Sequence, residues 1–310
     1  MSISGHSFAL LFILLFVCRP ATAAKVNDSN ETPELDTLID VRDGINIRMQ
    51  SAAQWLDALM ADETLDDKAH AKGYLRLGWL PRSADWSKTQ VRFTVQLSLP
   101  NWENRLKLII DNDADEFNRL PFETETPLAG NANAEDEVNA AIQYLYETTQ
   151  HIEIDNRLGV SRGQLYGRSA ANWQHQISNT LYSASAGLEY YFSDGFGQFI
   201  KLAADKQFDQ QFSLNWSANL RNIESEIDTE FRSGLYFSYL PDSKRAMVMG
   251  LNVKDSFDTL RSYNLSYRYR QQIKHSWLFY EIEPFLEYRE EFGYRDEIGI
   301  ALRLIGYYGQ

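Results

Sequence analysis

Residues 276–310 read SWLFYEIEPFLEYREEFGYRDEIGIALRLIGYYGQ, and this stretch predicts one antiparallel hairpin of two long strands around a polar turn. From residue 278 to residue 288 every second side chain is apolar or aromatic, and acids occupy most of the positions between them. Residues 298–304 alternate in the same way, and the stretch ends with the aromatic pair Tyr307 and Tyr308. Alternation with a period of two indicates a β-strand whose two faces meet different surroundings.

The same period of two begins near residue 69 and continues to the end of the chain. It predicts fourteen strands of about 9 to 15 residues, enough for a tilted strand to cross a bilayer. An even count suits a single-chain bacterial barrel, and twelve strands remain an alternative if two early segments do not enter the membrane. We therefore expect an all-β fold, a transmembrane antiparallel up-and-down β-barrel over residues 69–310. The strands are expected near residues 69–81, 88–99, 103–112, 139–147, 152–163, 165–178, 180–192, 196–206, 209–220, 226–240, 244–255, 259–271, 276–288 and 294–308.

The polar face of each strand distinguishes two folds. Residues 90–99, for example, are polar at even positions and apolar at odd positions. A soluble sandwich would turn the polar positions to outside water, whereas a barrel in a bilayer turns them to its lumen. If both termini are periplasmic, the connections on that side are all short, as expected of a barrel. The opposite side includes the 26-residue segment 113–138, which is too long for an ordinary connection and is either functional or disordered.

The first 68 residues lack this alternation. Residues 8–17 are an apolar run and residues 21–23 form a small-x-small site, so residues 1–24 are interpreted as a secretory signal peptide cleaved near Ala23 or Ala24. Residues 25–68 form an acidic extension, in which the spacing of apolar side chains predicts a short helix over residues 47–61. A periplasmic helix is favoured, and a helix that rests on the membrane or plugs the lumen is an alternative. Cys18 is the only cysteine, so the mature chain would contain no disulfide.

The formal net charge of -13 is concentrated outside the strand pattern. Residues 25–68 and residues 113–137 each carry a net charge of -7, and the strands with their turns are balanced. Acidic segments of this kind argue against nucleic acid as a partner. The partners expected of such a barrel are outer-membrane lipids and the barrel-insertion machinery of a Gram-negative cell, and the sequence indicates no oligomeric state.

Aromatic residues are concentrated in the region with strand periodicity. Several fall at or near the ends of the expected strands, where an outer-membrane barrel carries girdles of aromatic side chains at the two membrane interfaces. A plain aromatic core or a surface that stacks on a ligand would also collect such residues. The residues of the expected girdle are Trp79, Trp102, Trp173, Tyr182, Tyr190, Tyr239, Tyr280, Tyr288 and Tyr307.

Charged side chains gather on the proposed inner faces of the last three strands. The acids of one strand lie between the basic residues of its two neighbours. Each pair of directly opposed unlike charges stabilises adjacent strands by roughly 0.2–1 kcal/mol. We expect mainly a polar lumen that holds the barrel rigid. A lumen lined to select ions or small solutes is an alternative, and a catalytic or proton-relay role is the least favoured. This lumen charge network consists of Arg268, Arg270, Glu281, Glu283, Glu287 and Arg303.

Two weaker patterns point to chemistry. The acids that follow the third expected strand have calcium-loop spacing, but they lack the glycine and the final glutamate of an EF-hand, so a solvated loop is favoured over a divalent-ion loop. The step His275–Ser276 would suit a lipid-hydrolysing barrel, but no G-x-S-x-G frame surrounds it. No two histidines have zinc-ligand spacing, so we expect no metal site. Since no convincing catalytic constellation is present in the sequence, we also expect no cofactor and no enzymatic activity. The residues of the divalent-ion loop would be Asp111, Asp113, Asp115 and Glu116.

Residues 277–284, WLFYEIEP, and residues 303–309, RLIGYYG, resemble the ending of a family of uncharacterised proteobacterial outer-membrane barrel proteins. Residues 73–78, GYLRLG, and the Leu99–Pro100 turn are similar to that family too, so the resemblance covers about residues 69–310. The chain departs from the pattern by ending on Gln310 rather than on an aromatic residue. The resemblance implies a barrel in the outer membrane and brings no activity that can be assigned to a residue.

Taken together, these patterns favour an outer-membrane β-barrel with a structural, interaction or passive small-solute transport role. Two other classes stay open, an outer-membrane hydrolase that acts on lipids and a soluble periplasmic β-protein. The lipid hydrolase would need the His275–Ser276 step, and the soluble protein would need the apolar face of each strand to be buried.

Overall fold

The computed structural model of this chain describes residues 70–83, 88–99, 106–113, 118–123, 138–149, 151–226, 229–256 and 260–309. The helix expected over residues 47–61 and the expected signal peptide lie outside this range. Within it, no helix is long and apolar enough to cross a membrane. The described elements are β1 (His70–Trp79), β2 (Thr89–Leu99), β3 (Leu106–Asp111), β4 (Asn139–Thr149), β5 (Ile152–Ser161), β6 (Gln164–Ile177), β7 (Thr180–Tyr191), β8 (Gly195–Gln207), β9 (Phe212–Ile223), β10 (Glu230–Asp242), β11 (Arg245–Ser256), β12 (Leu260–Gln272), β13 (Leu278–Arg289), the 3₁₀ turn η3 (Glu290–Phe292) and β14 (Asp296–Tyr308).

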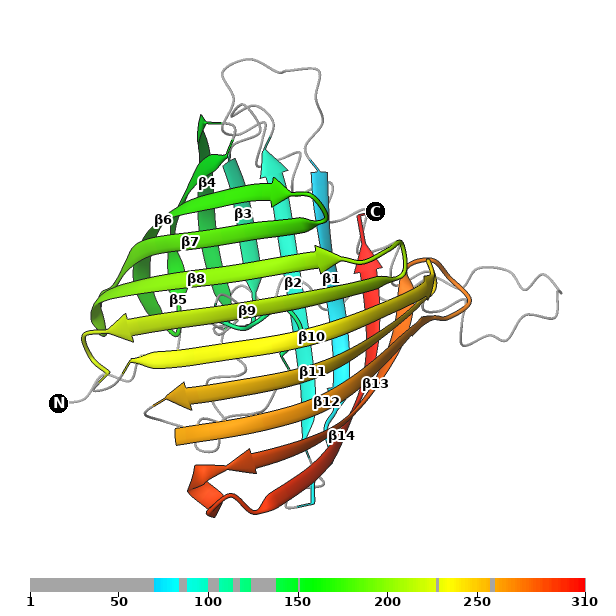
Figure 1. Ribbon diagram of the computed structural model, residues 1–310. Coiled ribbons are helices and arrows are strands. Elements are labelled where there is room, and N and C mark those ends of the chain that lie inside the picture. Colours follow the sequence, from blue (N-terminus) through cyan, green and yellow to red (C-terminus); the bar gives the residue numbers. More distant parts are fainter. Residues whose placement is uncertain are drawn as a thin grey trace, which may run out of the picture. The chain divides into compact units, whose positions relative to one another are not determined.

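These strands form one closed sheet. Each strand pairs antiparallel with the strands before and after it, and β1 also pairs with β14. Figure 1 shows this closure, with the blue end of the colour scale in β1 beside the red of β14. The predicted count of fourteen is confirmed, and the alternative of twelve is wrong. The largest error in a strand limit is at β10, which begins at Glu230 rather than near residue 226.

The burial of side chains is the inverse of that in a water-soluble sandwich. Large apolar residues on the outer face are exposed, such as Leu158 at 67% and Leu251 at 55%. Polar and charged residues on the inner face are buried, such as Glu189 at 2% and Arg232 at 3%. An apolar outside around a polar inside is the arrangement of a barrel that spans lipid, because the lumen is where polar groups can find partners.

The seam between β1 and β14 depends on a close contact across three strands. Gly73 on β1 is paired with Tyr308 on β14 and with Val95 on β2. The Tyr308 hydroxyl crosses over Gly73 and donates a hydrogen bond to the carbonyl oxygen of Thr94. Because Gly73 has no side chain, the ring of Tyr308 can lie against the backbone there, and the last strand is held to the first two.

Beyond the strand ends, the β1–β2 connection continues the seam. The backbone of Arg82 forms an isolated bridge with Gly299, and the amide of Ser83 donates to the carbonyl oxygen of Ile298 at 2.9 Å. This extension carries the Arg82 side chain to the turn end of the β13–β14 hairpin, where two carboxylates lie.

Candidate functional site

The inner faces of the strands line the lumen, and their charged side chains form clusters, three of which involve β12 to β14 and β6 to β9. Strand alternation explains why, since residues two apart on one strand share a face and meet the matching face of each neighbour.

The first cluster lies between β12, β13 and β14. Arg270 is 2.6 Å from Glu281, and Arg268 is 3.0 Å from Glu283. Arg303 on β14 reaches both acids, lying 3.6 Å from Glu281 and closer still to Glu283. Three guanidinium groups therefore share two buried carboxylates. This arrangement brings together five of the six residues that the sequence placed in one lumen network.

The sixth residue, Glu287, belongs to a second cluster at the other end of the β13–β14 pair. Glu287 is directly opposite Glu297 in the strand register. Arg82 lies 3.5 Å from Glu287 and 3.9 Å from Glu297, and Arg289 lies 2.5 Å from Glu297. Two arginines thus separate and bridge two like charges, because opposed carboxylates with no cation between them repel each other.

The third cluster is centred on Glu189 of β7. Its carboxylate accepts hydrogen bonds from Arg168 of β6 at 3.1 Å and from Arg221 of β9 at 2.5 Å. Both arginines also donate to the hydroxyl of Tyr191, at 3.2 Å and 3.3 Å. This cluster was not predicted from the sequence. The period of two in residues 164–191 and 212–223 does, however, place all four side chains on inner faces.

Residues 118–123 of the connection from β3 to β4 lie inside the lumen. Among the described residues of this connection, Leu120 packs against Tyr236 and Val248, and Phe122 lies edge-on to Tyr236 with ring centroids 5.4 Å apart. These contacts place residues 118–123, which we call the inner loop segment, against the walls formed by β10 and β11. Sequence analysis treated the connection only as functional or disordered.

Polar contacts hold the inner loop segment on both of its sides. Arg119 donates to Asp113 at 3.0 Å, and Glu123 lies 3.4 Å from Arg232 of β10. Asn219 of β9 donates to the backbone carbonyl of Asn118 at 3.0 Å. Because the segment is bound to β9, β10 and β11 and to its own stem, it divides the space inside the barrel.

Two cavities lie beside this segment, and both are lined by Arg119, Leu120 and Pro121. The larger has a volume of about 670 Å³ and extends along β3 to β9. The smaller has a volume of about 330 Å³ and is bounded by β1, β12 and β14. The inner loop segment therefore forms part of the lining of both cavities.

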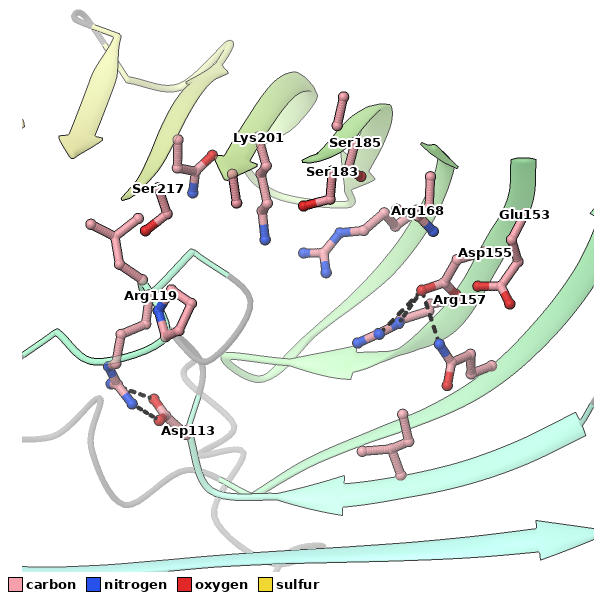
Figure 2. A pocket seen from close by; sticks show the side chains of 18 of the residues that line it. Asp113, Arg119, Glu153, Asp155, Arg157, Arg168, Ser183, Ser185, Lys201 and Ser217 are labelled. Atoms are coloured by element: carbon pink, nitrogen blue, oxygen red, sulfur yellow. Dashed lines mark hydrogen bonds and ion pairs between the residues drawn. The ribbon is translucent and has the colours of Figure 1, made fainter. Parts of the chain in front are cut away.

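The larger cavity is lined by charged side chains of both signs. Figure 2 shows Lys201 and Arg168 reaching into it from β8 and β6, and the Asp113–Arg119 pair lies at its edge. Acids line it as well, and Asp155 accepts from Gln143 at 2.9 Å and from Arg157 at 3.2 Å. A polar solute in this cavity would meet both signs of charge and several hydroxyl groups.

The sequence also singled out an acidic loop and a histidine step. Asp111 accepts from Asn139 at 2.9 Å, and Asp113 is paired with Arg119, while Asp115 and Glu116 lie outside the described residues. No three His, Cys, Asp or Glu side chains of the described residues lie together as metal ligands would. His275 stacks on Trp277 with ring centroids 5.7 Å apart, in the connection between β12 and β13.

Comparisons with known proteins support the fold. No family model matches the chain, and no curated protein matches it in sequence. Among solved structures, in-vitro folded OmpT, an outer membrane protein of Vibrio cholerae, is 8% identical, with 80% of this chain and 100% of that chain covered and a TM-score of 0.51. Its trimer form is 9% identical, with 78% and 99% covered and a TM-score of 0.51. A loop L8 deletion mutant of the same protein is 7% identical, with 78% and 99% covered and a TM-score of 0.50.

At these identities the likeness shows the fold. The chain has the closed, antiparallel architecture of an outer-membrane β-barrel protein, with an apolar outer surface and a charged lumen.

Proposed function

We propose that this protein is an outer-membrane barrel through which small polar solutes diffuse passively, past a constriction formed by the inner loop segment. The observation that carries the proposal is the pair of cavities on the two sides of that segment, which share Arg119, Leu120 and Pro121. Side chains alone can fill a barrel of about eight strands, whereas a barrel of fourteen strands is wider and leaves room for a solute in its lumen.

The proposal includes the cell outer membrane as the location. The exposed apolar outer face supports it, and so do exposed aromatic residues near the strand ends, among them Trp79, Tyr182 and Tyr288. Export would proceed through a signal peptide cleaved near Ala23 or Ala24, and residues 25–68 would remain as a periplasmic extension. We also infer that the chain belongs to the family of uncharacterised proteobacterial outer-membrane barrel proteins that its last hairpin resembles.

Two measurements test this proposal in sequence. Gel mobility of the purified protein before and after boiling, together with its membrane fraction, tests the closed barrel in the outer membrane. Planar-bilayer recording of the folded protein then tests the channel, and discrete conductance steps are expected. A protein with barrel-like mobility that gives no steps would instead have the structural or interaction role, and identical mobility with a water-soluble fraction would contradict the barrel in its membrane.

A further inference from the structure

The smaller cavity differs from the rest of the lumen in its charge. Among the residues that the structure describes, its charged lining side chains are four arginines, Arg76, Arg119, Arg268 and Arg270, and one acid, Glu123. The whole chain is acidic, with a formal net charge of -13. A local excess of cations inside an acidic protein is therefore not a consequence of overall composition.

These arginines come from three parts of the fold that converge on one space. Arg76 is on β1, Arg268 and Arg270 are on β12, and Arg119 belongs to the inner loop segment. The side chain of Arg270 is 35% exposed and that of Arg119 is 18% exposed, so water reaches both guanidinium groups. Groups that are partly buried and still accessible can bind a solute without being screened as strongly as surface charges.

Two acids of β13 pair with these arginines from outside the lining of the cavity. Glu281 and Glu283 are fully buried, and neither is among the residues that line the cavity. Each of these acids is paired with one arginine of β12, and both are also paired with Arg303. Three arginines therefore compensate two carboxylates on this wall, and the wall keeps a positive charge toward the cavity.

Hydroxyl groups complete the lining. Tyr74 and Tyr307 also border the cavity, with ring centroids 6.2 Å apart. The Tyr307 hydroxyl lies 3.3 Å from the Nη1 atom of Arg270. A guanidinium group beside a phenol offers several donors in one place, and the planar guanidinium fork matches the oxygen spacing of carboxylate and phosphate groups.

The larger cavity lacks this character. Its lining includes the acids Asp111, Asp113, Glu153 and Asp155 beside its basic residues, so a small anion there would meet repulsion as well as attraction. The contrast between the two compartments provides an internal control for charge.

We propose that the smaller cavity is a binding site for a small multivalent oxyanion, a solute with phosphate or carboxylate groups. Its volume of about 330 Å³ lies within the range of small-molecule sites. The inference rests on the proposed channel for the route by which such a solute reaches the site. Binding itself does not require that the solute pass through the barrel.

Calorimetry on the full mature chain, folded in detergent, tests the site directly. The probes are inorganic phosphate and, in a separate titration, succinate. Saturable binding of phosphate alone, of succinate alone or of both supports the proposal and identifies which oxyanion the site prefers. Absence of binding for both probes at millimolar concentrations overturns it.

Variants locate the binding. The double variant Arg76→Gln/Arg270→Gln is expected to weaken binding by about tenfold or more, because it removes two of the four cations. Arg76→Lys keeps the charge and loses the fork, and an intermediate loss is expected. The matched control is Lys201→Gln, which removes a cation from the larger cavity and is expected to change the affinity less than twofold. Equal losses in the control and the double variant would overturn the assignment to the smaller cavity.

The outcome separates this site from the proposed channel. Binding without conductance steps would keep the site and reject the channel, whereas conductance without binding would reject the site and keep the channel. Mobility of unboiled samples on a gel verifies that each variant is a folded barrel, and Arg76→Lys provides a gentler substitution if the double variant does not fold.

Discussion

Phe122 of the inner loop segment lies edge-on to Tyr236 of β10, with ring centroids 5.4 Å apart and an interplanar angle of 61°. Tyr236 is fully buried, and its hydroxyl donates to the side-chain oxygen of Asn252 on β11. The added contact of Leu120 with the same ring makes Tyr236 the centre of the apolar surface on which the segment rests. Tyr236 therefore provides the main apolar contact of the inner loop segment with the barrel wall.

Replacing Tyr236 by alanine should release the inner loop segment and raise the single-channel conductance. Removal of a buried aromatic ring costs about 3–5 kcal/mol, so the variant should also be less stable to heat or denaturant. Planar-bilayer recording measures the conductance, and gel mobility confirms that the barrel is closed.

The control for this change is Tyr236→Phe, which keeps the ring and removes only the hydrogen bond to Asn252. We expect the Tyr236→Phe conductance to equal that of the natural protein. An unchanged conductance in Tyr236→Ala would show that the segment is not the constriction.

The inner loop segment also marks the limit of what the sequence could predict. Leu120-Pro121-Phe122 is a short apolar run within a strongly acidic connection, and this was the available signal that the connection packs against something. Its partner, Tyr236, lies on a strand that joins the lumen wall far along the chain. No local pattern relates the two, because their contact depends on the closed barrel.

The strands were predictable because the period of two can be recognised within a few neighbouring residues. It has one physical cause, which is that successive side chains of a strand point to opposite faces of the sheet. Along β2, the inner residues Arg92 and Thr94 are buried and the outer residue Val91 is exposed, as expected for a lipid-facing outside. The pairing of lumen charges was less predictable, since it depends on register. Glu287 shares a face with Glu281 and Glu283, but the register sets it opposite Glu297 and out of their cluster.

Arg303 is expected to contribute strongly to stability, because it compensates both Glu281 and Glu283 in the first cluster. Arg303→Met should lower the free energy of unfolding by about 3–5 kcal/mol, as when one partner of a buried ion pair is removed. Denaturant unfolding in detergent or lipid measures this change.

Arg261→Met is the matched control for that substitution. Arg261 lies 2.7 Å from Asp255, but both side chains are largely exposed, and little or no loss of stability is expected. Equal effects of the two substitutions would contradict the view that burial makes the Arg303 pairs important.

Gly73→Ala should weaken the seam between β1 and β14. A methyl group at this position would collide with the carbonyl oxygen of Thr94 and the hydroxyl of Tyr308. The backbone oxygen cannot move aside easily, so we expect a loss of about 1–3 kcal/mol, typical of overpacking. Unboiled gel mobility at increasing temperature reports the opening of the barrel.

For comparison, Gly167→Ala places a methyl group in open space on β6, where the nearest atom, from Leu158, is 3.9 Å away. The barrel of this variant should open at the same temperature as that of the natural protein. If Gly73→Ala opens at the same temperature as Gly167→Ala, the contact of Tyr308 with Thr94 does not hold the seam.

The Arg82 side chain should stabilise the barrel only because it compensates the opposed carboxylates of Glu287 and Glu297. The β1–β2 connection places its guanidinium group 3.5 Å from Glu287 and 3.9 Å from Glu297, and Arg289 alone would otherwise have to compensate both acids. Arg82→Gln should therefore destabilise the barrel, whereas Arg82→Gln/Glu287→Gln should recover much of the loss, since the repulsion is then gone. A double-mutant cycle in denaturant measures the coupling. Additive effects of Arg82→Gln and Glu287→Gln would mean that the Arg82 side chain stabilises the barrel through other contacts, such as that of its guanidinium group with the ring of Phe285, rather than by separating two charges.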